Sequence, residues 1–206
     1  MKSRTLRWAV SVVVLAFAAS IGAPAQGPLP RQFSGVINDY SPISGGTTAW
    51  EVRGPWHLNL KGDSRTADFS AAVTMELSVL GQSSANVLSA SLTQHTHHIT
   101  MKDAAVSIET VETSDCPTFS PPTSGSVLVV TGDASVTANG NVITPFDPSG
   151  GTSPLTVCVS GGPNVPYANV TLQFGKPASM HFGPQAIHGV VRTPKRSDED
   201  DHQYDR

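Results

Sequence analysis

Three of the seven histidines fall within four positions of each other, at His95, His97 and His98. Side chains alternate between the two faces of a β-strand, so His95 and His97 share one face with Ile99 and Met101. The apolar members predict that this face points inward and that His98 points outward. Two neutral imidazoles one pleat apart can bind a single transition metal, and imidazole suits Zn, Cu, Fe and Ni. We therefore predict a metal site, for Zn or Cu, on this strand.

A metal site of this kind needs a third protein ligand and keeps one position open. His181 and His188 are the first candidates, because they flank Gly183, where the chain is expected to bend. They are an odd number of residues apart, so one regular strand would place them on opposite faces. His57 is the next candidate.

Two other interpretations of His95 and His97 stay open. In the first, they hydrogen-bond to each other, to threonine hydroxyls or to backbone carbonyls, and have no further role. In the second, they act as a general acid and base without a metal. The sequence contains no nucleophile elbow, P-loop, dinucleotide-binding glycine motif, zincin helix or EF-hand loop. The catalytic residues and the residues that bind an organic ligand are therefore not assigned.

The chain has two cysteines, Cys116 and Cys158. An even number of cysteines in an exported chain predicts a disulfide. No C-x-x-C motif is present, so the sequence gives no support to thioredoxin-like chemistry. Two thiolate metal ligands are the alternative interpretation.

The elements that must position these side chains are short runs with an alternating apolar pattern, separated by turn residues. The clearest are residues 56–60 and 69–77, and the others are 99–101, 104–109, 126–131, 134–138, 141–146, 155–159, 167–174 and 187–191. We expect turns at 131–134 and at Asn139-Gly140, a strong hairpin signal. The fold class is therefore all-β, a single antiparallel β-barrel or β-sandwich of roughly ten short strands with little helix.

The two ends of the 206-residue chain differ from its middle. Residues 1–25 read as a signal peptide, with three cations, a short apolar run and the small residues Ala23-Pro24-Ala25 at the cleavage site. Residues 26–32 form an extended lead-in, 33–191 the β domain, and 192–206 a charged tail that we expect to be disordered. We predict export to a periplasmic or extracellular location, with no stable membrane insertion after cleavage.

Composition limits the function classes. Charged residues make up only 14% of the chain, against roughly 25% in an average soluble domain. The formal net charge of −3 provides no basic stripe, so we expect no nucleic-acid partner.

The sequence resembles known protein families in two ways, through a short histidine motif and through longer segments. Histidines in an H-x-H pattern on a strand, as at His95 and His97, resemble the first metal motif of the cupins and the copper-ligand pair of copper/zinc superoxide dismutases. In a cupin a glutamate follows this motif by a few residues, and here Asp103 follows it at a looser distance. The segments 56–74, 95–100 and 181–191 are similar to uncharacterised secreted bacterial β-domain proteins, a resemblance that implies no function.

Two functions remain as expectations. The first is an exported β-domain that acts as a binding or structural module for an undetermined small-molecule or protein ligand. The second is a metal-dependent enzyme, an oxidoreductase or a cupin-like protein, built on His95 and His97.

Overall fold

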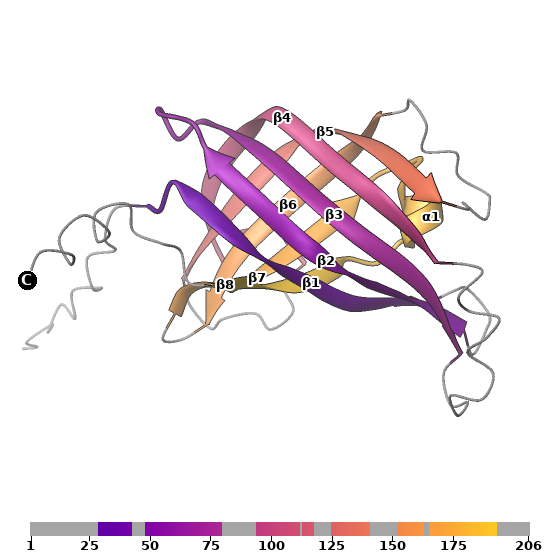
Figure 1. Cartoon of the computed structure of the whole chain (residues 1–206). Helices are drawn as coiled ribbons and strands as arrows, with labels where there is room; N and C mark the ends of the chain where they lie inside the picture. Colours follow the sequence, from indigo (N-terminus) through magenta and orange to yellow (C-terminus); the bar gives the residue numbers. More distant parts are fainter. Residues whose placement is uncertain are drawn as a thin grey trace, which may run out of the picture.

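The computed structural model describes residues 29–42, 48–79, 94–111, 113–117, 125–140, 152–162 and 165–192. Within these ranges the chain is an all-β closed barrel whose eight antiparallel strands follow one another around the ring in chain order, with β8 closing onto β1 (Figure 1). The strands are β1 (Gln32–Pro42), β2 (Thr48–Leu60), β3 (Thr66–Val79), β4 (His95–Thr110), β5 (Ser126–Gly140), β6 (Thr152–Gly162), β7 (Val165–Phe174) and β8 (Ile187–Arg192).

The alternating pattern of the sequence separates the inside of the barrel from its outside. On β3, for example, Phe69, Val73 and Met75 are at most 2% exposed, whereas the alternate residues Ser70, Ala72 and Thr74 are half-buried. Trp56 is fully buried, as expected for a core residue. Burying one large apolar side chain contributes roughly 1.5–3 kcal/mol, so this continuous interior stabilises the ring.

Eight long strands replace the roughly ten short ones that the sequence predicts. The runs at 99–101 and 104–109 form one strand, β4, with an irregularity in pairing between Thr100 and Ala105, where Asp103 has a φ of 52°. β4 has one more residue than its partner strand at this irregularity, and the Ala104 side chain therefore points into the barrel. The predicted turn at 131–134 is wrong, because these residues pair continuously with β6 inside β5.

Several sequence predictions fall on residues outside the described ranges. These are the signal peptide, most of the lead-in, the run at 141–146 and the charged tail beyond Arg192. Asn139 and Gly140 are described: they are the last residues of β5 and pair with Thr96 and His95, so the turn predicted there is wrong. Arg192 itself is the last residue of β8.

Cys116 and Cys158 form a disulfide, with a Cα–Cα distance of 6.1 Å. Cys158 lies on β6 with its side chain buried against Val127 and Val129 of β5, and Val111 packs on the same small cluster. This cluster is separate from the main core. The disulfide therefore fastens the segment after β4 to the barrel wall.

The single helix in the described ranges, α1 (Ser179–Phe182), follows β7. It lies at the end of the barrel where β5 finishes (Figure 1). None of the helical structure in these ranges is long and apolar enough to cross a membrane.

Candidate metal centre

β4 places two of the predicted ligands inside the barrel. His95 is 2% exposed and His97 is fully buried, whereas His98, on the same strand, is exposed. Ile99 and Met101 continue the same inward face. The alternation expected from the sequence is therefore present, and the register is continuous from His95 to Thr100 on both sides of the strand.

α1 supplies the third imidazole, from His181, which is 6% exposed. Two buried serines hold the helix at its ends. The Ser153 hydroxyl on β6 accepts a hydrogen bond from the Ala178 backbone N–H at 3.0 Å, and the Ser41 hydroxyl on β1 donates to the Phe182 carbonyl. Two separate strands of the barrel, β1 and β6, thus fix a helix of only four residues, and with it the position of His181.

The chain leaves α1 through Gly183, whose φ is 94°. A side chain rarely adopts this conformation, and a Cβ atom here would lie 2.5 Å from the Ser41 hydroxyl. Glycine is therefore required for the helix to end against β1.

Aromatic rings surround the histidines. Phe182 stacks on Phe174 at a centroid distance of 4.5 Å and meets the His97 ring edge-on at 5.0 Å. The Trp50 ring of β2 meets the His95 ring at 5.2 Å, also edge-on. These contacts restrict the imidazoles to one orientation and surround them with apolar surface.

The three rings point their Nε2 atoms at one another. The Nε2 atom of His181 lies 3.0 Å from that of His95 and 2.8 Å from that of His97. Four nitrogens placed tetrahedrally at ~2.05 Å around a zinc ion are roughly 3.3 Å apart. The two distances to His181 are therefore within about half an ångström of the spacing that ligands of one ion adopt. The ligand atoms of all three residues lie within 4.8 Å of one another.

Burial keeps His97 and His181 uncharged. Desolvation, together with the neighbouring imidazoles of His181 and His95, lowers the pKa of His97 to about 3. Desolvation and His95 lower the pKa of His181 to about 4. At neutral pH both rings are neutral, which is the form that binds metals.

The second ring nitrogen of His97, Nδ1, is buried and makes no hydrogen bond. The backbone of Thr137 raises the pKa of His97 and so partly opposes desolvation. If the proton of the neutral ring is on Nδ1, the lone pair of Nε2 is available to a metal.

The structure does not bring His188, the fourth predicted ligand, to the other three histidines. It lies on β8, opposite Thr171 of β7, and its Nδ1 atom is 2.8 Å from a carboxylate oxygen of Asp39. The same oxygen accepts the His188 backbone N–H at 2.8 Å. His181 and His188 are not on one strand, because the turn after Gly183 separates a helix from a strand. His57 is exposed on β2 and also lies outside the cluster.

Sequence reasoning missed the residues that position His181. Ser41 and Ser153 look like ordinary strand serines, and only the register of their strands reveals that both are inward and buried. Trp50 was also missed: its ring contacts those of His95 and His181.

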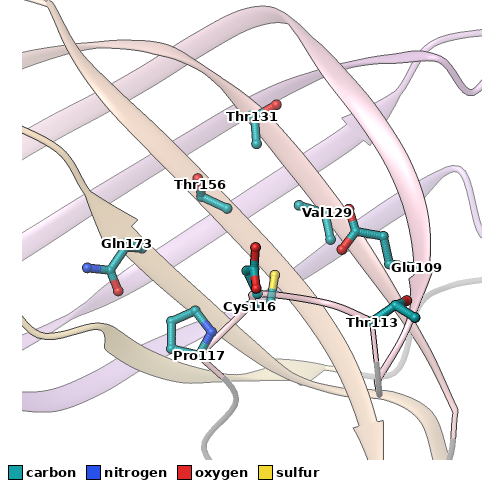
Figure 2. A pocket seen from close by; sticks show the side chains of 9 residues that line it. Glu109, Thr113, Cys116, Pro117, Val129, Thr131, Thr156 and Gln173 are labelled. Carbon is teal, nitrogen blue, oxygen red and sulfur yellow. The ribbon is translucent and has the colours of Figure 1, made fainter.

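A cavity of ≈ 360 Å³ lies on the barrel wall beside the disulfide (Figure 2). Its lining is mostly polar: Glu109, Thr113, Asp115, Cys116, Pro117, Val129, Thr131, Thr156 and Gln173. None of the histidines contributes to it, so it is separate from the candidate metal centre.

Comparison of the chain with models of protein families, with curated proteins and with solved structures returned no match. The resemblances to cupins, copper/zinc superoxide dismutases and secreted bacterial β-domain proteins therefore stay predictions.

Proposed function

We propose that this barrel is a metal-binding module that holds one transition-metal ion through the Nε2 atoms of His95, His97 and His181. The observation that carries the proposal is the convergence of three buried imidazole nitrogens, with His181 Nε2 at 3.0 and 2.8 Å from the other two. In the described ranges these three residues form the only group of histidine, cysteine or acidic side chains arranged to hold an ion.

The geometry supports a metal more strongly than a purely structural hydrogen-bond cluster. A neutral imidazole carries one proton on its two nitrogens. If His95 and His97 both donate from Nε2–H to His181, they compete for the single lone pair of its Nε2 atom, and the hydrogen bonds are poorly satisfied. A metal ion instead accepts all three Nε2 lone pairs at once, and each Nδ1 then keeps its proton.

Burial favours binding over catalysis. The three side chains are at most 6% exposed, whereas an enzyme needs a coordination position that a substrate can reach. A buried ion suits storage, transfer or structural support. We also propose that the protein is exported, which the disulfide between Cys116 and Cys158 supports because such bonds persist in oxidising compartments.

Metal analysis of the purified protein by mass spectrometry tests the proposal. We expect one equivalent of a transition metal per chain after incubation with Zn²⁺ or copper and removal of excess ion. The triple variant His95→Gln, His97→Gln, His181→Gln should retain none, while the matched variant His188→Gln should retain the full equivalent. Equal metal content in the triple variant and the original protein would refute the proposal.

A further inference from the structure

A buried methionine lies next to the three histidines. Met75 of β3 is fully buried and directly opposite His95 in the pairing of β3 with β4. Directly opposite residues on antiparallel strands project to the same face, with Cβ atoms about 4.5–5.5 Å apart. The side chain of Met75 is therefore an immediate neighbour of His95 inside the barrel.

The residues around Met75 also belong to the neighbourhood of the histidines. Trp50 of β2, whose ring lies 5.2 Å from that of His95, pairs with Leu77 of β3, two residues from Met75. Met75 itself is 0% exposed, so its thioether is inside the barrel and not directed to solvent.

A thioether distinguishes between metals. Zinc is bound in proteins by thiolate, imidazole and carboxylate groups. Soft sulfur ligands, including methionine, select monovalent copper. A methionine at this position adds a fourth donor for Cu⁺ and contributes little for Zn²⁺.

The charge of the site favours the same ion. No carboxylate or thiol joins the three histidines within the part of the chain that the structure describes, and Phe182 and Trp50 cover the rings. Neutral donors leave the charge of the ion uncompensated. The Born cost of burying an ion rises with the square of its charge, so a dication costs about four times as much as a monocation of the same size.

We propose that the site is specific for monovalent copper and that the Sδ atom of Met75 is its fourth ligand. This inference rests on the proposed function, because it needs the three imidazoles to bind a metal. It goes further in naming the ion and in giving Met75 a role that the fold alone does not require.

Met75→Leu tests the inference, with Met101→Leu as the matched control. Met101 is 1% exposed and lies on the inward face of β4, six residues beyond His95, or roughly 20 Å along the strand. Both substitutions replace a buried thioether by an apolar side chain of similar volume. Only the first removes a sulfur beside the histidines.

Cu⁺ affinity is measured without oxygen by competition with bicinchoninate, and Zn²⁺ affinity by competition with a fluorescent chelator. We expect Met75→Leu to weaken Cu⁺ binding at least about tenfold and to leave Zn²⁺ binding within about twofold. Met101→Leu should change neither. X-ray absorption at the copper edge should show a copper–sulfur distance in the original protein and in Met101→Leu, and none in Met75→Leu.

The possible results distinguish a failure of the Met75 proposal from a failure of the three-histidine metal site. If the histidine variants lose metal but Met75→Leu binds Cu⁺ as tightly as the original protein, without any copper–sulfur distance in either, the three-histidine site stands and the role of Met75 is refuted. If Met75→Leu weakens Cu⁺ and Zn²⁺ equally, the methionine is a packing residue and the copper specificity is refuted. If no metal binds at the histidines at all, both proposals are refuted.

Discussion

Two histidine environments in this barrel differ in what they offer to a metal. At β4 and α1, His95, His97 and His181 meet one another among aromatic rings. On β8, His188 meets the carboxylate of Asp39, and both side chains are half-buried. The carboxylate occupies the Nδ1 atom of His188 and supplies a negative charge beside it. In the buried cluster, burial lowers the pKa values of His97 and His181 and holds both rings neutral. The Nε2 atom of His181 lies within 3.0 Å of those of His95 and His97.

The comparison shows that neighbouring side chains, and not the residue type, decide the chemistry of an imidazole here. A histidine beside a carboxylate becomes part of an ion pair or a fixed hydrogen bond. Neutral histidines that meet without a carboxylate can offer their nitrogen lone pairs to a metal ion. The following experiments are ordered from the largest expected effect to the smallest.

The largest expected effect is on metal affinity. His97→Gln should weaken metal binding more than about 100-fold, because it removes a direct ligand, whereas loss of a supporting group alone costs about 10–100-fold. His188→Gln should change affinity less than about twofold. Isothermal titration of each protein with Zn²⁺ checks this, with folding verified by circular dichroism. A comparable loss in His188→Gln would contradict the distinction between the two environments.

Acid should destabilise the metal-free protein through the buried histidines. In the unfolded chain histidine takes up a proton near pH 6.5, but in the folded barrel His97 does so only at about 3 and His181 at about 4. The unfolded state therefore binds more protons below pH 6.5, and stability falls as the pH falls. Between pH 7 and 5 we expect a loss on the order of 1–2 kcal/mol per histidine.

Urea unfolding at several pH values, with chelator present, measures this loss. His181→Gln should reduce the dependence on pH, and His98→Gln, which removes an exposed imidazole from β4, serves as the control. Stability that is independent of pH between 7 and 5 would show that the histidines are not buried as the structure places them.

Asp39→Asn should affect stability and leave metal binding intact. The Asp39 carboxylate accepts the backbone N–H groups of Tyr40 and His188, at 2.7 and 2.8 Å, as well as contacting His188 Nδ1. An amide replaces one of these acceptor oxygens by a donor, which we expect to cost about 1–2 kcal/mol. Urea denaturation measures this, with the exposed Asp133→Asn as the control. Loss of metal from Asp39→Asn would mean that the two histidine environments are coupled.

The smallest effect is expected at His98. Its side chain is exposed on the outer face of β4, so His98→Ala should change the free energy of unfolding by less than about 0.5 kcal/mol and should not affect metal affinity. Thermal melts with and without Zn²⁺ test this. If His98→Ala proves more damaging than His95→Ala, the assignment of faces on β4 is wrong.

The sequence by itself determined the features that follow from short-range rules. The two-residue alternation around His95, His97, Ile99 and Met101 assigned the inward face of β4, because successive side chains of a strand must point to opposite faces. The same rule identified the all-β class. The two cysteines led to the expected pair, because no other pairing within the chain exists.

Tertiary structure alone decided which distant residues meet. His181 and His188 look equivalent in the sequence, on either side of Gly183, but the barrel places one in a helix fixed by Ser41 and Ser153 and the other beside Asp39. The number of strands was equally hidden, since a single extra residue near Asp103 lets two apolar runs continue as one strand. Ring closure and strand register set these contacts between residues far apart in the chain, and local periodicity carries no information about either.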